Sequence, residues 1–145
     1  MKIGKRRQAR ENVLKILYQM EILGEDHNTV LESYWNTIPK IDSKVKEFAN
    51  ELVKGISEKR NELDEIIKSR LKNWNFDRVA VIDKNILRMG IYEIKFRDDI
   101  PDNVSINEAI EIAKKYGDVE SSRFINGILD KVAKSKTEKS DATSP

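Results

Sequence analysis

Apolar residues recur at intervals of three and four along nearly the whole chain, and this spacing is the strongest constraint on the fold. It places side chains on one face of an α-helix, whereas a half-buried strand needs strict alternation, which is hard to find here. Only three prolines and six glycines interrupt the 145 residues. The sequence therefore predicts an all-α chain of a length that suits a single domain.

Seven helices are expected, and several have a recognisable first residue. Capping residues accept hydrogen bonds from the free N–H groups of a first turn. The first four helices are, in order, a stripe from Val13 to Met20 ending near Gly24, a segment opened by the capping box Thr29 to Glu32 and running through Trp35, a helix started by Asp42 or Ser43, and a stripe from Leu63 to Trp74.

The last three helices follow the same logic, and the fifth is apolar over more than half of its circumference. We expect that helix to be central, with Gly90 marking a close crossing. Beyond Ser135 only Ala142 is apolar, so residues 135–145 are predicted to be a disordered tail. The three helices are Arg78 to Phe96 with Asp77 as N-cap, Ser105 to Gly117 opened by the capping box Ser105 to Glu108, and a helix capped by Asp118 with its stripe from Ile125 to Val132.

The composition argues against catalysis, cofactors and metals. The chain has no cysteine and one histidine, which excludes cysteine zinc sites and His-pair metal sites. His27 is interpreted as a solvated loop residue, and no glycine-rich phosphate loop is present. No apolar run approaches a membrane span and no secretion signal precedes the helices. We expect a cytoplasmic binding protein with no small-molecule substrate.

Positive charge is concentrated at the N-terminus. The first ten residues hold five cations and no acid, which leaves 22 basic against 25 acidic groups in the rest of the chain. Tyr18 shares a helix face with Arg7, and arginines near an exposed tyrosine suit phosphates and a stacked base. The alternative is a solvated basic end. The five cations are Lys2, Lys5, Arg6, Arg7 and Arg10.

A second candidate surface lies on the last helix. Phe124 projects roughly 90° from the centre of the apolar stripe, which places it at the edge of the core or outside it. Glu120, Gly127 and Lys131 fall in the same sector of the helix. This strip suits contact with RNA or protein, and the alternative is that Phe124 folds back over the core edge.

Two segments of the chain resemble the NusB transcription antitermination family. They are KRRQARENVLKILYQME at 5–21 and VSINEAIEIAKKYGDVESSRFINGILDKV at 104–132, and the second is the more specific match. The resemblance covers about 2–134. It implies two small helical bundles packed into one compact RNA-binding domain at 1–134.

The resemblance also implies a function, namely binding of the boxA element of nascent ribosomal RNA together with NusE, a ribosomal small-subunit protein. The pair helps to assemble an antitermination complex on RNA polymerase with other Nus factors. Asp77 and Asp83 match acidic positions that face NusE. The positions matching RNA contacts are Lys2, Lys5, Arg6, Arg7, Arg10, Tyr18, Glu120, Arg123 and Phe124.

Two other functions are alternatives to this one. Some RNA cytosine methyltransferases carry a NusB-like domain, but this chain lacks both a cysteine and a nucleotide-binding loop. The other is a helical protein–protein adaptor in ribosome or RNA-processing assembly that makes no direct contact with RNA. Salt-dependent RNA binding separates the adaptor from the antitermination factor.

Overall fold

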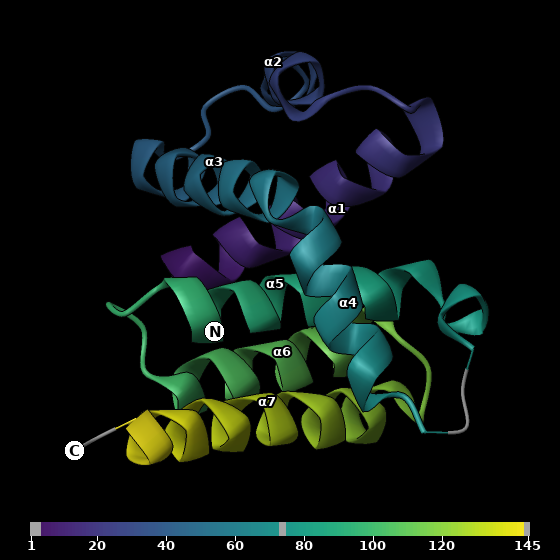
Figure 1. The fold of residues 1–145 in the computed structure, drawn as a ribbon. Helices are drawn as coiled ribbons and strands as arrows, with labels where there is room; N and C mark the ends of the chain where they lie inside the picture. Colours follow the sequence, from purple (N-terminus) through teal and green to yellow (C-terminus); the bar gives the residue numbers. More distant parts are fainter. Residues whose placement is uncertain (1–3, 73–74, 144–145) are drawn as a thin grey trace. The chain divides into compact units, whose positions relative to one another are not determined.

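The computed structural model describes residues 4–72 and 75–143, with side chains as far as Lys136. Within these residues the chain forms seven α-helices, one short 3₁₀ helix and no strand (Figure 1). It divides into two compact units, Met1–Lys59 and Arg60–Pro145. The all-α prediction with seven helices is confirmed, and each unit is a small group of helices.

The first unit contains α1 (Lys5–Leu23), α2 (His27–Asn36) and α3 (Ser43–Glu58). The apolar stripes of α1 and α3 pack against each other and are buried. The indole N–H of Trp35 on α2 donates to the side-chain oxygen of Asn50 on α3 at 2.7 Å. Gly24 ends α1 in the left-handed conformation at φ 66°, where a glycine carries no steric penalty.

The start of α2 differs from the prediction. The N-cap is Asp26, whose carboxylate accepts from the Thr29 N–H at 2.9 Å, so Thr29 lies inside the first turn. The predicted capping box at Thr29 is wrong because Asp26 takes the cap position three residues earlier. His27 is consequently the first helical residue and not a loop residue.

The second unit contains α4 (Arg60–Arg70), the 3₁₀ helix η1 (Phe76–Arg78), α5 (Val81–Phe96), α6 (Asp102–Tyr116) and α7 (Ser121–Thr143). As predicted, α5 is central, because it packs against α4, α6 and α7. Gly90 makes this possible: a Cβ there would lie 2.8 Å from the Leu129 Cδ1 on α7. The predicted close crossing at Gly90 is confirmed.

Two helix starts in this unit also differ from the predictions. Asp77 lies within η1 and α5 begins at Val81, so Asp77 is not its N-cap. α6 begins at Asp102, which places Ser105 inside the helix. The capping box at Ser105 is wrong because its buried hydroxyl donates to the Glu93 carboxylate on α5 at 2.8 Å.

The C-terminal helix continues past the residue where the tail was predicted to start. Ser135 accepts a hydrogen bond from Arg70, and the Lys136 ammonium donates to the Ile94 carbonyl at 2.7 Å. No proline or glycine interrupts the chain between Gly127 and Pro145, so helix propagation is not blocked. The first two residues of the predicted tail are therefore held by the second unit. Residues 144 and 145, like Trp74 of the predicted fourth helix, lie outside the described residues.

Candidate nucleic-acid interface

The N-terminal cations of the first unit lie on the first turns of α1. The Lys5 ammonium is 3.2 Å from the carboxylate of Asp42, the N-cap of α3. The Arg6 guanidinium lies over the Phe48 ring, 4.4 Å from its centroid. Both side chains are exposed beyond these contacts, so each holds a defined position at the surface. Lys2 lies outside the described residues.

Arg10 does not have the exposure expected of a phosphate contact. Its side chain is 2% exposed, and its guanidinium lies 5.5 Å from the centroid of the Phe48 ring. A buried guanidinium covering an aromatic ring stabilises packing through its stem and its charge. The structure therefore favours a structural role for Arg10, which the sequence placed among the RNA contacts.

Tyr18 is 52% exposed and lies on the same helix as the arginines. Arg7 is half-buried, and Leu14, which lies between the two in angle, is buried. Eleven residues of helix separate Arg7 from Tyr18 by about 16 Å along the axis. The two side chains therefore occupy separate positions along α1.

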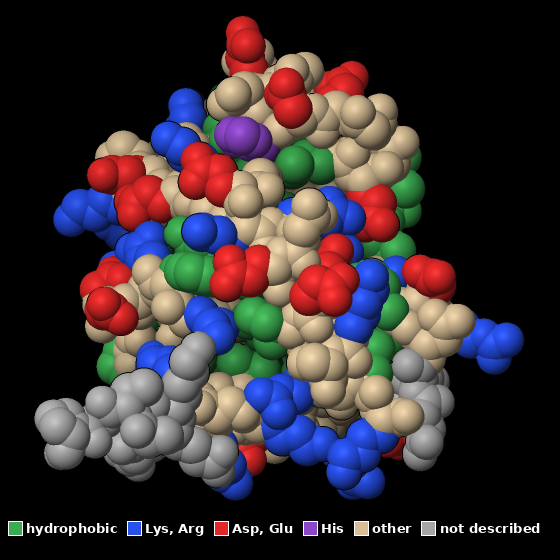
Figure 2. Space-filling view, in the orientation of Figure 1, with side chains coloured by type: hydrophobic (Ala, Val, Ile, Leu, Met, Phe, Trp, Pro, Cys, Tyr) green, Lys and Arg blue, Asp and Glu red, His purple; other side chains and the backbone are tan. Residues whose placement is uncertain are grey.

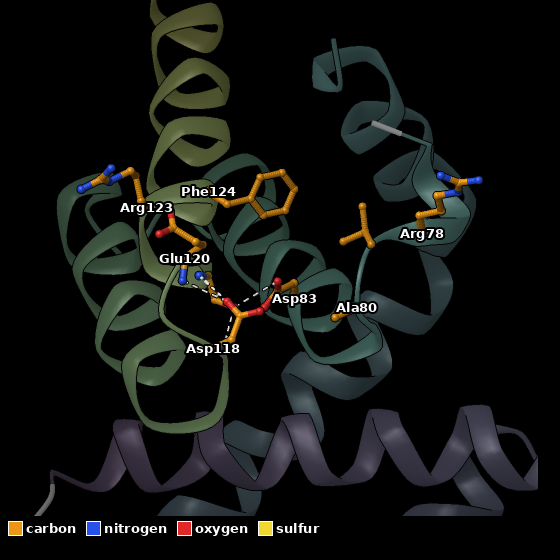
Figure 3. Close-up of a pocket in the computed structure, with 9 residues that line it drawn as sticks. Arg78, Ala80, Asp83, Asp118, Glu120, Arg123 and Phe124 are labelled. Atoms are coloured by element: carbon orange, nitrogen blue, oxygen red, sulfur yellow. Dashed lines mark hydrogen bonds between the residues drawn. The ribbon is translucent and has the colours of Figure 1, made fainter. Parts of the chain in front are cut away.

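The second unit holds a hollow of about 390 Å³, which we call the Phe124 pocket. Figure 3 shows the Phe124 ring projecting from α7 toward Ala80 and Arg78 on the opposite wall. Phe124 is half-buried, so the predicted position at the edge of the core is confirmed. The lining residues are Arg78, Val79, Ala80, Asp83, Asp118, Glu120, Ser121, Arg123 and Phe124.

Hydrogen bonds in the turn before α7 hold the acidic residues on one side of this pocket. The Asp118 carboxylate accepts from the backbone N–H of Glu120 at 2.9 Å and of Ser121 at 3.1 Å. This fixes the first turn of α7, as predicted for Asp118. Glu120 and Arg123 are exposed there, and the Arg123 guanidinium points away from the Phe124 ring (Figure 3). The pocket thus combines an aromatic face with carboxylates that can accept hydrogen bonds from a base.

Asp83 is the buried member of the pocket. It is 8% exposed, its Oδ2 accepts from the Ser121 hydroxyl at 3.1 Å, and its Oδ1 is buried with no partner among the described residues. Burial raises the pKa of Asp83 above its usual 3.8, partly offset by the Ser121 hydrogen bond, and the nearby Asp118 raises it further. A carboxyl buried in this way is poorly placed to contact NusE, which is the role that the family resemblance implies for Asp83. Asp77 is exposed and remains available for such a contact.

Sequence reasoning missed the cations around Phe76. The Lys84 and Lys68 ammonium groups lie 4.5 Å and 5.1 Å from the centroid of this ring. Nearby, the buried Arg88 on α5 forms an ion pair with Asp64 on α4 at 2.7 Å. These residues lie on α4, η1 and α5, and the packing of α4 against α5 brings them together.

The described part of the chain has no feature of a metal site or of a membrane span. There, no group of three or more His, Asp or Glu side chains could hold a metal ion. Nor is any helix in those residues both long and apolar enough to cross a membrane. The candidate sites are therefore the basic end of α1 and the Phe124 pocket.

Comparison with known proteins gives a consistent result. The NusB family model matches residues 7–134. The transcription antitermination protein NusB of Myxococcus xanthus is 46% identical over 134 residues, covering 90% of this chain and 96% of the relative. The NusB of Bacillus cereus is 46% identical over 128 residues, covering 88% and 96%. The family model covers the residues of the Phe124 pocket and begins on α1 at Arg7.

Solved structures agree with the sequence relatives. The structure of T. maritima NusB has 43% identity and a TM-score of 0.81, covering 92% of this chain and 93% of that one. A crystal structure of the antitermination factors NusB and NusE in complex with dsRNA has 25% identity and a TM-score of 0.81, covering 90% and 97%. The same helical fold thus occurs in a protein crystallised with RNA and NusE.

Proposed function

The chain belongs to the NusB family, and we propose that it is a transcription antitermination factor that binds boxA RNA of nascent ribosomal transcripts together with NusE. The bound pair helps to assemble the antitermination complex on RNA polymerase with other Nus factors, in the cytoplasm where transcription takes place. The observation that carries the proposal is 46% identity over nine-tenths of the chain to a transcription antitermination protein, NusB of Myxococcus xanthus. The proposed function is binding, and no reaction is assigned.

The basic end of α1 supplies the electrostatic part of RNA binding. Arg6 and Arg7 present guanidinium groups from a rigid helix, and Arg6 is steadied by the Phe48 ring. Each phosphate neutralised on a single strand releases counterions, so affinity falls as salt rises. These contacts position the strand without reading its sequence.

The Phe124 pocket supplies the base contact. A base stacks on the exposed part of the Phe124 ring, and Glu120 lies one helical turn away to accept a hydrogen bond from its edge. A carboxylate accepts but does not donate, so it favours bases that present N–H groups there. This pocket is therefore the source of sequence preference in the proposal.

The surface for NusE includes Asp77, which is exposed in η1. A ribosomal protein that packs on RNA is basic, and opposite charges speed encounter and fix the register of two surfaces. Asp83 is buried and lines the Phe124 pocket, so its carboxyl group is not offered to NusE. We assign the direct contact to Asp77.

Size-exclusion chromatography with this chain, NusE and a boxA-like RNA tests the proposal. We expect a ternary complex with the matched RNA and a weaker one with a scrambled RNA. Asp77→Lys should weaken NusE association while leaving the melting temperature and NusE-free RNA binding unchanged. A chain that binds NusE but gives no salt-dependent RNA binding would be a protein adaptor, contrary to the proposal.

A further inference from the structure

A second hollow of about 230 Å³ lies between the end of α4 and the face of α7, and it shares Arg123 and Phe124 with the Phe124 pocket. We call it the basic groove, and it is lined by Arg70, Lys72, Arg123, Lys131, Phe124 and Gly127 among others. Building on the proposed function, we infer that the basic groove binds the sugar–phosphate backbone of the nucleotides next to the base held at Phe124. This extends the RNA-binding surface along α7 to the end of α4.

The charge of the groove supports a polyanion as its occupant. Its lining has four cations and no acid. Figure 2 shows Lys and Arg side chains gathered over α7 and the end of α4 in this unit. Among the described side chains, no carboxylate forms an ion pair with Lys72, Arg123 or Lys131, whereas the neighbouring Lys134 is paired with Asp130 at 3.0 Å. Clustered cations without carboxylate partners repel one another, and a bound phosphate chain would relieve that repulsion.

The α7 side of the basic groove has room for an RNA strand to lie close to the helix. A Cβ at Gly127 would meet nothing within 4 Å, so this position leaves the helix backbone bare toward open space. On the α4 side, Arg70 donates to the Ser135 hydroxyl, while its Nε is buried with no partner among the described residues. The hydrogen bond to Ser135 holds the Arg70 guanidinium at the α4 side of the groove, so its positive charge has a fixed place there.

The two hollows differ in charge, and that difference sets the orientation of the RNA. Three carboxyl groups line the Phe124 pocket beside two arginines, whereas every charged residue that lines the basic groove is a cation. Carboxylates repel phosphates but accept hydrogen bonds from base N–H groups. Phe124 lines both hollows. A nucleotide there would direct its base into the Phe124 pocket and its phosphates over the basic groove.

The test compares two double variants of equal charge change. Lys72→Ala with Lys131→Ala removes two groove cations, and Lys114→Ala with Lys134→Ala removes two exposed lysines paired with acids outside the groove. Fluorescence anisotropy measures the binding of a boxA-like RNA, extended on both sides, at salt concentrations from about 0.05 to about 0.5 M. The groove variant should lower the salt slope by about 1.4, at about 0.7 per phosphate. If affinities converge at 1 M salt, this slope gives about a 25-fold loss at 0.1 M salt.

A second pair of variants tests the part of the groove at Gly127 without removing a cation. Gly127→Glu places a carboxylate in the groove and should weaken binding more than Gly127→Gln, which adds a side chain of similar size without the charge. Melting temperatures confirm that each variant is folded.

The outcomes separate the groove from the proposed function. If the groove double variant matches its control in slope and affinity while the parent chain binds boxA-like RNA, the groove inference is wrong and the proposed function stands. If Lys72→Ala with Lys131→Ala weakens NusE binding and leaves RNA binding unchanged, the groove faces protein and the inference is again wrong. Failure of the parent chain to bind RNA, with or without NusE, would overturn the proposed function itself.

Discussion

Replacement of Phe124 by alanine removes the ring shared by the Phe124 pocket and the basic groove. A base stacked on an aromatic side chain contributes about 1–3 kcal/mol, which corresponds to a loss of about 5- to 150-fold in affinity. A fully buried phenylalanine costs about 3–5 kcal/mol of fold stability when truncated. Phe124 is only half-buried, so we expect Phe124→Ala to lower the free energy of unfolding by about 2 kcal/mol or less.

Anisotropy titrations with a boxA-like RNA and thermal melts measure the two effects separately. Phe124→Tyr serves as the control, since it keeps an aromatic face and should retain most of the affinity. Phe124→Leu keeps apolar volume without that face and should bind like the alanine variant. The stacking argument is refuted if Phe124→Ala binds RNA as tightly as the parent. A large drop in stability with normal affinity would return Phe124 to the core.

Three further predictions concern other parts of the molecule. Arg7→Ala should lower the salt slope of RNA binding by about 0.7 for matched and scrambled RNA alike, and an unchanged slope in salt titrations would remove it from the interface. Burial raises the pKa of Asp83 above 3.8, so the folded state binds this proton more tightly than the unfolded state, and stability is lost as pH rises from 3.8 through the raised pKa. Thermal melts from pH 3 to 7 should therefore show the melting temperature of Asp83→Asn increasing relative to that of the parent as pH rises. A relative decrease would contradict this prediction. Gly90→Ala should destabilise the fold by about 1–3 kcal/mol, because its methyl would lie 2.8 Å from Leu129. Gly127→Ala meets open space and should stabilise the fold by about 0.5–1 kcal/mol. Denaturant unfolding in which both variants change stability in the same direction would contradict this prediction.

Most of the helical fold could be predicted from the sequence, because helical periodicity reports directly on which face is buried. Of the two predicted starts of α3, Asp42 and Ser43, the N-cap is Asp42, and α1 ends before Gly24 as expected. The central place of α5 also follows from its apolar circumference, and Gly90 correctly indicates its close crossing. These features are local in sequence, so one chain is enough to read them.

Helix starts failed where a polar residue had a tertiary partner. Ser105 has the sequence context of a cap, yet its hydroxyl is buried against Glu93 of the preceding helix. At Thr29 the error was local, since Asp26 competes for the same free N–H groups and takes the cap. Sequence patterns give the residue types that can cap a helix, but packing decides which of them does.

The candidate sites divide in the same way. The edge position of Phe124 followed from a helical wheel, whereas the burial of Arg10 over Phe48 depends on how α1 meets α3. The basic groove depends on Arg70 and Lys72 meeting α7, roughly sixty residues later in the chain. Long-range contacts of this kind leave no periodic signal in the sequence.

The most direct test of the account is a titration of the parent chain with boxA-like and scrambled RNA at one fixed salt concentration, with and without NusE. We predict tighter binding of the matched RNA and a further gain in affinity when NusE is present, because the chain and NusE bind the RNA together. Equal binding of the two RNAs in the presence of NusE, or no binding of either, would contradict the account.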